Sequence, residues 1–547
     1  MKGLMMDMPL TVTAIMRHTE RASLNEEIVS VTQDNPRHRC TYAQTFRRAR
    51  QLAHALTAFG IRAADRVGTL AWNDYRHVEL YYAISGMGAI THTINPRLFP
   101  EQIAWIINHA RDRILFVDPL VLPVVDKIRA QLPHVEALVV LTDAEHMPAA
   151  SNALCYETFI AGQPDTFHWP DLDEQSACNL CYTSGTTGDP KGVLYSHRSQ
   201  VLHSLFSSSV DALALSARDV IMPVVPMFHV NAWGLCYSAP MVGAKLVLPG
   251  PKMGDGETLQ NLIETEGVTF SAGVPTVWLA LLDYLRRSGK RVDSLQRLVI
   301  GGSACPWSIM EEFEQSYNVH VHHAWGMTEM SPLGTVNHPI RGTDELPASE
   351  KHARRMKQGR ALFGVEMKVV NEEDIELPCD GKSAGVLKVS GPTVCAQYFQ
   401  EPGPGPAHSE PGWFATGDVA NIDADGYLQI TDRSKDVIKS GGEWISSIDL
   451  ENAAVGHPAV AEAAVIAVPH PKWAERPLLV LVLREGKTVT RDEMLEFLKP
   501  RVAKWWLPDD VVCVAEIPHT ATGKILKTEL RKRFTDYKLP DSSSLTP

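Results

Sequence analysis

The sequence contains no apolar run of the roughly 20 residues needed to cross a membrane, and its first 20 residues lack the apolar core of a signal peptide. We therefore expect no integral membrane segment and a cytoplasmic location. Nine cysteines, an odd number in a chain without an export signal, predict free thiols in a reducing compartment. Cys178 and Cys181 match a C-x-x-C pattern, but no second pair accompanies them, so no zinc site is predicted.

The sequence also has no excess of basic residues. Lys and Arg number 52 against 64 Asp and Glu, which gives a formal net charge of -12. This charge argues against nucleic acid as a partner and leaves room for a local basic cluster that binds an anionic substrate. With 44% hydrophobic and 21% charged residues the composition is that of an ordinary globular protein, and 547 residues predict two or more domains.

Helical and extended patterns alternate up to about residue 365. Residues 41–59 have apolar side chains at helical spacing, with Thr41 and Gln44 as a capping box and Gly60 as a stop signal. Short extended runs are predicted at 67–71, 90–94, 114–117, 245–248, 269–272, 297–300 and 319–324. This alternation predicts parallel sheets covered by helices on both faces, with ligands bound where loops leave the carboxyl ends of strands.

Beyond that point the pattern changes to shorter runs with many turn signals, which predicts a β-rich piece. From about residue 436 the tail has extended and helical patterns of its own, including a run at 463–468 and a capping box formed by Thr490 and Glu493. The tail is long enough for a small separate domain.

The most informative stretch is 182–193, which reads Tyr-Thr-Ser-Gly-Thr-Thr-Gly-Asp-Pro-Lys-Gly-Val. Glycines let backbone N–H groups approach an anion, the hydroxyls add donors, and Lys191 provides a positive charge. Because this loop follows an apolar run, it predicts a phosphate cradle at the end of a buried strand. It is not a Walker loop, since Lys191 follows Pro190 and precedes Gly192.

Residues 182–193 resemble the signature loop of the adenylate-forming superfamily, which includes acyl-CoA synthetases, adenylation domains of peptide synthetases and beetle luciferases. Further segments match motifs of the superfamily in its order: 226–233, 302–304, 325–329, 413–418, 432–443 and 518–524. The likeness covers most of the chain and is strongest to bacterial medium-chain acyl-CoA ligases and 3-methylthiopropionate-CoA ligases.

The resemblance implies that the chain binds ATP with Mg²⁺. Lys191 would hold the triphosphate, Thr328 would donate to the α-phosphate, and Glu329 with Thr183 would bind the metal, for which carboxylate oxygen is a suitable ligand. Lys524 would bridge the substrate carboxylate and the α-phosphate during adenylation. The catalytic residues implied are Lys524, Lys191, Thr328 and His229.

The resemblance also implies contacts to the rest of the nucleotide and to coenzyme A. Trp325, where most members have Tyr, would stack on adenine beside the small residues 302–304, and Asp418 would accept both ribose hydroxyls. The residues implied for these cofactors are Thr183, Ser184, Gly185, Thr186, Thr187, Gly188, Lys191, Gly302, Ser303, Ala304, Trp325, Gly326, Met327, Thr328, Asp418, Arg433, Lys435, Lys439, Gly441, Gly442 and Glu443.

The segment 226–233 is apolar apart from His229 and Asn231 and contains no acidic residue. It is similar to the segment of fatty acyl-CoA synthetases in which the His lines the acyl site and the Trp gates it, whereas amino-acid adenylators need a carboxylate there. The residues implied for the acid substrate are His229, Trp233, Gly302, Gly326 and Pro332.

The fold class implied is α/β: a large N-terminal domain (1–434) of stacked α/β subdomains plus a small β-rich subdomain, joined by a hinge to a small mobile α+β C-terminal domain (435–547). Lys435 or Asp436 would be the pivot. Rotation would withdraw Lys524 and bring the segment 439–443 toward the CoA thiol.

The function implied is an ATP-dependent ligase that converts a small- or medium-chain carboxylic acid to its CoA thioester through acyl-AMP. An acyl-AMP ligase that loads a carrier protein and a non-catalytic nucleotide and fatty-acid binding protein remain as alternatives. Related fatty acyl synthetases imply a homodimer.

Overall fold

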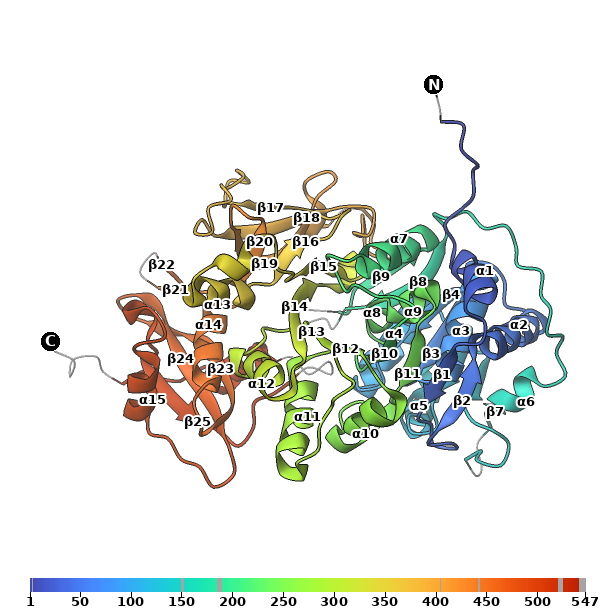
Figure 1. Cartoon of the computed structure of the whole chain (residues 1–547), viewed down its shortest axis with the longest axis horizontal. Coiled ribbons are helices and arrows are strands. Elements are labelled where there is room, and N and C mark those ends of the chain that lie inside the picture. The colour runs from blue at the N-terminus through green and yellow to red at the C-terminus, as the bar shows by residue number, and fades with distance from the viewer. Residues whose placement is uncertain are drawn as a thin grey trace.

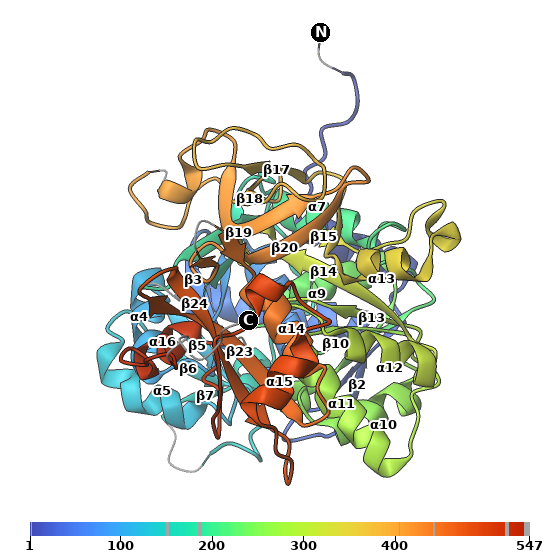
Figure 2. The same cartoon turned by 90° about the vertical axis from the view of Figure 1, so that its left-hand side faces the viewer.

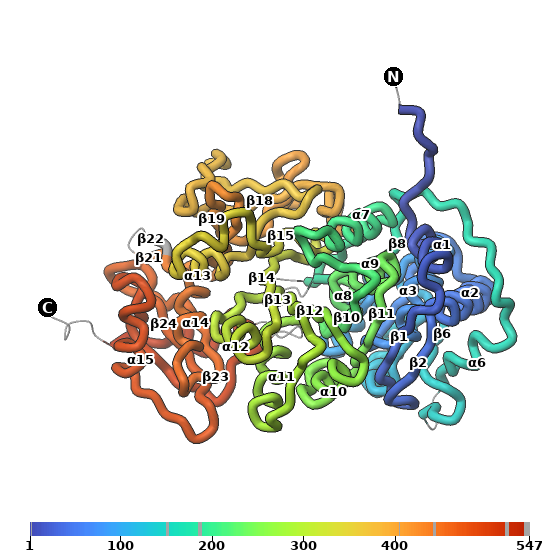
Figure 3. Tube along the Cα trace, viewed as in Figure 1, coloured from blue at the N-terminus to red at the C-terminus, as the bar shows by residue number. Residues whose placement is uncertain are grey.

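The computed structural model describes residues 1, 3–148, 152–183, 189–403, 405–440, 443–519 and 525–540, with the backbone alone at 443 and 444. Figure 1 shows the N-terminal half in blue to green, a β-rich layer in yellow to orange, and a C-terminal body in red. The Cα tube in Figure 3 places this C-terminal body at the end of the molecule opposite α1 (Val12–Ala22) and α2 (Tyr42–Phe59).

The first layer is a seven-stranded sheet in the order β7-β6-β5-β3-β4-β8-β9. Its strands are β3 (Arg66–Leu70), β4 (Ile90–Thr93), β5 (Ile114–Val117), β6 (Ala137–Val140), β7 (Leu154–Cys155), β8 (Ala177–Tyr182) and β9 (Gly192–Ser196), and its helices are α3 (Tyr75–Gly86), α4 (Pro100–Ala110), α5 (Leu122–Ile128) and α6 (Tyr156–Ile160). Neighbouring strands are parallel except for β8 and β9. Helix α3 is buried at every residue and contacts β4, β8 and β1 of the next sheet, so it lies in the core between the two sheets.

The second sheet has the order β17-β18-β19-β20-β16-β15-β14-β13-β12-β10-β11-β1-β2. Its strands are β1 (Glu27–Ser30), β2 (His38–Thr41), β10 (Val220–Pro223), β11 (Lys245–Leu248), β12 (Phe270–Gly273), β13 (Arg297–Ile300), β14 (His320–Gly326), β15 (Leu333–Val336), β16 (Gly359–Ala361), β17 (Glu366–Val370), β18 (Gly385–Ser390), β19 (Phe414–Ile422) and β20 (Tyr427–Arg433). The run from β1 to β14 is parallel, and from β14 to β17 every pairing is antiparallel. Strand β14 is therefore shared by an α/β half and a β-rich half.

Helix α7 (His197–Ser208) follows β9 of the first sheet. The helices that follow strands β10 to β15 of the second sheet are α8 (Val230–Trp233), α9 (Leu235–Val242), α10 (Gly256–Glu266), α11 (Pro275–Ser288), α12 (Trp307–Tyr317) and α13 (Ala348–Met356). The strand order reverses at β10, because β11 lies on one side of it and β12 on the other. Ligands of open α/β sheets bind at such a reversal, outside the carboxyl ends of the strands. The residues after Pro223 and Gly273 therefore form the expected edge of a site.

The C-terminal body has its own sheet, in the order β22-β21-β24-β23 with β25 parallel to β24. Its elements are β21 (Ile438–Ser440), β22 (Glu443–Ile445), β23 (Val460–His470), β24 (Ala474–Leu483), β25 (Asp510–Cys513), α14 (Ser447–Val455), α15 (Arg491–Leu498) and α16 (Lys527–Arg533). Its two apolar cores contain no residue before Ile438, so it folds around its own interior. Figure 2 shows this body from its own end.

The fold prediction is confirmed: a large α/β region with a β-rich part precedes a small C-terminal body. Thr41 and Gln44 form the predicted capping box of α2, Gly60 ends it with φ 102°, and all nine cysteines are free. Two predicted runs were too short, since β14 extends through Gly326 and β23 covers Val460–His470. Among the described residues no helix is long and apolar enough to span a membrane. The boundary at residue 434 stays a prediction.

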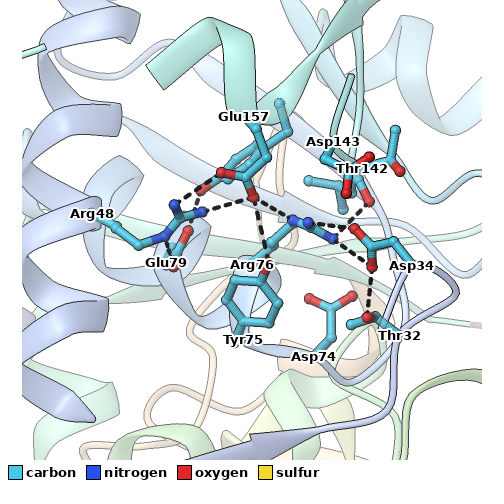
Figure 4. A network of polar contacts seen from close by, with 12 residues as sticks. Thr32, Asp34, Arg48, Asp74, Tyr75, Arg76, Glu79, Thr142, Asp143 and Glu157 are labelled. Carbon is cyan, nitrogen blue, oxygen red and sulfur yellow. Dashed lines mark hydrogen bonds and ion pairs between the residues drawn. The ribbon is translucent and has the colours of Figure 1, made fainter. Parts of the chain in front are cut away.

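A buried ionic network joins the β1–β2 connection to the helices of the first layer (Figure 4). Arg48 on α2 contacts Glu79 at 2.6 Å and Glu157 at 2.9 Å, and Arg76 on α3 contacts Glu157 at 2.9 Å and Asp34 at 2.6 Å. Each arginine therefore binds two carboxylates, as buried charges require. The network fixes the edge of the second sheet against α2, α3 and α6.

Asp74 lies next to this network (Figure 4) and caps α3 by accepting from the backbone N–H of His77 at 2.9 Å. Burial raises the pKa of Asp74 to about 7. A raised folded pKa means that stability is greatest below the pKa of the unfolded chain and is lost as pH rises through about 7.

We expect Asp74→Asn to keep the cap and to remove this loss, so that the variant is more stable than the wild type at pH 8 by on the order of 1 kcal/mol. Asp74→Ala is the matched control, because it removes the cap acceptor as well as the titrating carboxyl, and it should be less stable than Asp74→Asn by about 0.5–2 kcal/mol at every pH. Melting temperatures between pH 6 and pH 8 check both. A wild type and an Asn variant with parallel pH profiles would contradict the assignment.

Candidate active site

The predicted phosphate loop connects two antiparallel strands of the first sheet. Strand β8 ends at Tyr182, and the loop is closed at its base by two hydrogen bonds between Thr183 and Lys191: N–H to carbonyl at 2.9 Å, and the N–H of Lys191 to Thr183 Oγ1 at 3.2 Å. The predicted residues Ser184, Gly185, Thr186, Thr187 and Gly188 lie outside the described residues. The described base of the loop therefore holds Lys191 next to the end of β8.

The side chain of Lys191 is half-exposed, and its ammonium group contacts two of the described residues. Its Nζ lies 3.2 Å from Glu401 Oε1 and 4.6 Å from the ring centroid of Tyr398. Both residues come from the connection between β18 and the 3-10 turn η5 (Pro406–His408), more than 200 residues away along the chain. A carboxylate and an aromatic face both attract a cation, so this connection holds the lysine at the site.

Three predicted nucleotide residues from distant segments meet beside the end of β14. The indole Nε1 of Trp325 donates to Asp418 Oδ2 at 2.9 Å, and Arg433 Nε lies 2.7 Å from Asp418 Oδ1. Asp418 is only 2% exposed, so these two donors compensate the burial of its carboxylate. The register of β19 and β20 pairs Asp418 with Arg433, so the pairing of these two strands places the arginine beside the carboxylate.

Thr328 and Glu329 begin the 3-10 turn η3 (Thr328–Met330), directly after β14. The hydroxyl of Tyr195 donates to the carbonyl of Thr328 at 2.6 Å, and the hydroxyl of Tyr398 donates to Glu329 Oε1 at 2.7 Å. Burial and the charge of Glu329 raise the pKa of Tyr398, so it remains a donor. The structure thus brings Lys191 to the ring and Glu329 to the hydroxyl of one tyrosine, which the sequence did not single out.

Among the described residues there is no cluster of three or more His, Cys, Asp or Glu side chains that could hold a metal ion by themselves. Glu329 and Thr183 are the predicted metal ligands, and Glu329 is almost fully buried. Mg²⁺ in nucleotide sites takes one or two carboxylates and completes its shell with phosphate oxygens and water. A single glutamate beside the phosphate loop fits that pattern.

The turn that follows η3 is packed tightly against the end of β14. The N–H of Met327 donates to the carbonyl of Pro332 at 3.0 Å, and a Cβ at position 326 would lie 2.2 Å from that carbonyl oxygen. Gly326 is therefore required by close backbone approach. The N–H of Leu333, next in the chain, donates to Nε2 of the buried His203 at 3.1 Å.

The segment after β10 is held by one buried amide. The Nδ2 of Asn73 donates to the carbonyls of Pro223 at 2.9 Å and Val225 at 2.8 Å, and its Oδ1 accepts from the N–H of Met227 at 2.7 Å. Tyr81 donates to the carbonyl of Met227 as well. These contacts join the end of the first sheet to the segment that contains the predicted acid-binding residues.

The next residues adopt an unusual backbone. Val230, Asn231, Ala232 and Trp233 have φ between 46° and 55°, and Gly234 has 76°. Left-handed helical backbone costs about 1–2 kcal/mol for each residue other than glycine, so tertiary contacts must hold this turn. Asn231 provides such a contact, since its Oδ1 accepts from Tyr81 at 3.3 Å.

This left-handed turn places Trp233 at the carboxyl edge of the second sheet. A Cβ on Gly301 would lie 3.1 Å from the Trp233 ring, and one on Gly302 would lie 3.9 Å from it. Ser303 and Ala304 follow at the same edge, with Ser303 exposed. His229 lines one pocket with Thr183, so the predicted acid and phosphate residues adjoin.

The hinge prediction falls on the connection between β20 and β21. The N–H of Ser447 donates to Asp432 Oδ2 at 2.6 Å, and Asp436 Oδ1 lies 2.5 Å from Arg531. Burial lowers the pKa of Lys435. Lys439 reaches Glu372 of the β-rich part at 3.6 Å. Gly441, Gly442 and Lys524 lie outside the described residues, as does the side chain of Glu443.

Residues 17–399 match the family described as AMP-binding enzyme, and residues 449–524 match the AMP-binding enzyme C-terminal domain. A 3-methylmercaptopropionyl-CoA ligase from Ruegeria lacuscaerulensis is 52% identical over 98% of this chain and 99% of its own. A medium-chain-fatty-acid–CoA ligase from Ectopseudomonas oleovorans is 49% identical over the full length of both.

Among solved structures, an anthranilate CoA ligase in complex with anthranoyl-AMP is similar to this fold with a TM-score of 0.86 and 27% identity. The match covers 97% of this chain and 98% of that one. The similarity therefore extends over both the large region and the C-terminal body.

His203 on α7 contacts two segments of this site. Its Nε2 accepts from the N–H of Leu333 after η3, and a Cβ on Gly234, after the left-handed turn, would lie 2.6 Å from its Nδ1. Burial lowers the pKa of His203 to about 3, so it is neutral at physiological pH. We expect His203→Leu to leave the N–H of Leu333 buried without its acceptor and to lower stability by about 1–3 kcal/mol.

His203→Gln, whose amide oxygen offers an acceptor, should retain part of that stability. Thermal unfolding at pH 6 and pH 8 measures both variants, and the difference should be the same at the two pH values. Equal stability of the Leu and Gln variants would show that the hydrogen bond is not what His203 contributes.

Proposed function

Because the chain belongs to the AMP-binding enzyme family, we propose that it is an ATP-dependent acyl-CoA ligase that converts a small- or medium-chain carboxylic acid to its CoA thioester. The acid first becomes an acyl-AMP with release of pyrophosphate, and CoA then displaces AMP. Two relatives at about half identity over their whole length are named as acid–CoA ligases, which supports this reaction. Medium-chain fatty acids and 3-methylthiopropionate are the substrates proposed.

The observation that carries the proposal is the meeting of Trp325, Asp418 and Arg433 beside Glu329. A flat indole, a buried carboxylate and a guanidinium fit adenine and a ribose with two hydroxyls. Asp418 would exchange the indole donor for ribose hydroxyls. Lys191 and a Mg²⁺ ion held by Glu329 and Thr183 would hold the phosphates beside it.

In the first half-reaction, a carboxylate oxygen of the acid attacks the α-phosphorus in line, and the bond to the bridging oxygen of pyrophosphate breaks. The protein contributes positioning and neutralisation of charge rather than a covalent intermediate. Lys191, Thr328 and Lys524 are the groups proposed for that neutralisation. Mg²⁺, when bound, withdraws charge from the leaving pyrophosphate.

The acid would bind at the edge formed by His229, Trp233 and Gly302. This edge lies where the strand order reverses at β10, and its two glycines, Gly301 and Gly302, leave room beside the Trp233 ring. No carboxylate stands in the segment 226–233, so an apolar acid is favoured over an amino acid.

In the second half-reaction we propose that the domain 435–547 rotates about Lys435 or Asp436. Rotation would carry Lys524 away and bring the segment 439–443 toward the CoA thiol. The hydrogen bond from Ser447 to Asp432 crosses this junction and would have to change, whereas Asp436 and Arg531 form an ion pair inside the rotating domain. A homodimer and a cytoplasmic location are proposed for the same enzyme.

We expect Lys524→Ala to abolish pyrophosphate release but to retain thioester formation from supplied acyl-AMP and CoA, because the lysine acts on charge that develops only in the first half. Lys532→Ala, an exposed lysine on α16 of the same body, is the matched control and should retain both. The two halves are measured separately by pyrophosphate and acyl-CoA assays. Equal loss of both halves in the Lys524 variant would refute the two-conformation mechanism.

The acid itself is identified by pyrophosphate release with straight-chain acids of increasing length, 3-methylthiopropionate and an aromatic acid, each at equal concentration. We expect the highest kcat/KM for 3-methylthiopropionate or a medium-chain acid and a much lower value for the aromatic acid. Trp233→Ala should broaden the accepted lengths. No pyrophosphate release with any acid of the panel would contradict the proposed function.

A further inference from the structure

The connection between β18 and η5 runs along the phosphate and metal residues. The N–H of Cys395 donates to the carbonyl of Glu329 at 2.7 Å, and the N–H of Phe399 donates to the carbonyl of Gly192 at 2.8 Å. One short segment, 395–401, is thus bound by its backbone both to the predicted metal ligand and to the residue after Lys191.

Tyr398, within this segment, touches the two predicted charges with two different parts of its side chain. Its ring centroid lies 4.6 Å from Lys191 Nζ, and its hydroxyl donates to Glu329 Oε1 at 2.7 Å. The side chain is 7% exposed and packs against His408 and Phe414, with ring centroids 5.6 and 6.3 Å away. The packing of these two rings against the Tyr398 ring therefore fixes its position.

A lysine and a buried glutamate this close to one ring would attract each other strongly if nothing separated them. Among the described residues the ion pair of Lys191 is with Glu401, at 3.2 Å, and not with Glu329. The Lys191 and Glu401 side chains are 46% and 30% exposed, so this pair is weak and readily exchanged for a phosphate. A direct pair with the buried Glu329 would be much harder to separate.

We propose that Tyr398 is a positioning residue for adenylation: its ring holds Lys191 and its hydroxyl orients Glu329, which keeps the cation and the carboxylate beside one another without an ion pair between them. Lys191 then meets phosphate oxygens, and Glu329 meets the metal on the same triphosphate. This inference rests on the roles proposed above for Lys191 and Glu329.

The test uses two substitutions that divide the two contacts. Tyr398→Phe keeps the ring and removes the hydroxyl, and Tyr398→Leu removes both. Phe414→Leu is the matched control for packing, since Phe414 is buried against the same ring and is not one of the residues assigned to ATP or metal.

Binding of α,β-methylene-ATP is measured by calorimetry, in EDTA and in excess Mg²⁺. In EDTA we expect Tyr398→Phe to bind as the wild type does and Tyr398→Leu to bind about two- to fivefold more weakly, through loss of the ring contact to Lys191. Mg²⁺ should raise the affinity of the wild type for α,β-methylene-ATP. In both Tyr398 variants this gain in affinity should be about three- to tenfold smaller, because the hydrogen bond to Glu329 is lost. Phe414→Leu should show the wild-type gain.

Kinetics give a second readout. The Mg²⁺ concentration for half-maximal pyrophosphate release should rise in both Tyr398 variants, whereas thioester formation from supplied acyl-AMP should stay within about twofold of wild type, which a merely misfolded site would not allow.

Glu329→Gln distinguishes the positioning role of Tyr398 from the metal role of Glu329. If Glu329→Gln loses the Mg²⁺ gain and Tyr398→Phe retains it, the role of Tyr398 is wrong and the metal role of Glu329 stands. If Glu329→Gln retains the gain, the proposed metal role fails and the inference fails with it.

Discussion

The buried carboxylate of Asp418 is the constraint on which the rest of the site depends. It lies in the middle of β19 and is satisfied by Trp325 near the end of β14 and by Arg433 at the end of β20, so three strands of one sheet must bring these residues together. A buried charge without both donors would be costly. The continuity of the second sheet through β14 is what allows a parallel α/β half and an antiparallel half to share this single group.

Local signals predicted much of the fold. The capping box of Thr41 with Gln44 and the runs 114–117, 245–248 and 297–300 depend on neighbouring residues, and the structure has them as expected. Tyr398, His203 and Asn73 could not be found in this way, because their partners lie 69, 130 and about 150 residues away. The left-handed turn at 230–233 likewise has no local signal, since long-range contacts impose it on residues that disfavour it.

The residues of the candidate site were predicted mainly from resemblance to superfamily motifs and less from the chemistry of their side chains. Trp325, Asp418 and Arg433 were named from motif positions, and the structure brings them together, but nothing in their spacing along the chain shows that they touch. Roles assigned to Lys524 and to the centre of the phosphate loop remain predictions of the same kind. The contact between Ser447 and Asp432 is an example. This hydrogen bond joins a strand of the large region to a helix of the C-terminal body, and the pattern of neither segment shows that the two meet.

The reversal of strand order at β10 separates two kinds of variation. The segments after β10 and β13 shape the edge where an acid would lie, whereas the end of β14, the middle of β19 and the end of β20 carry the groups expected to face the nucleotide. Sequence drift or deliberate randomisation of the segment after β10 can therefore act on the acid edge while the groups expected to face the nucleotide are left untouched. Such modularity makes this scaffold a suitable starting point for directed evolution toward new acyl groups.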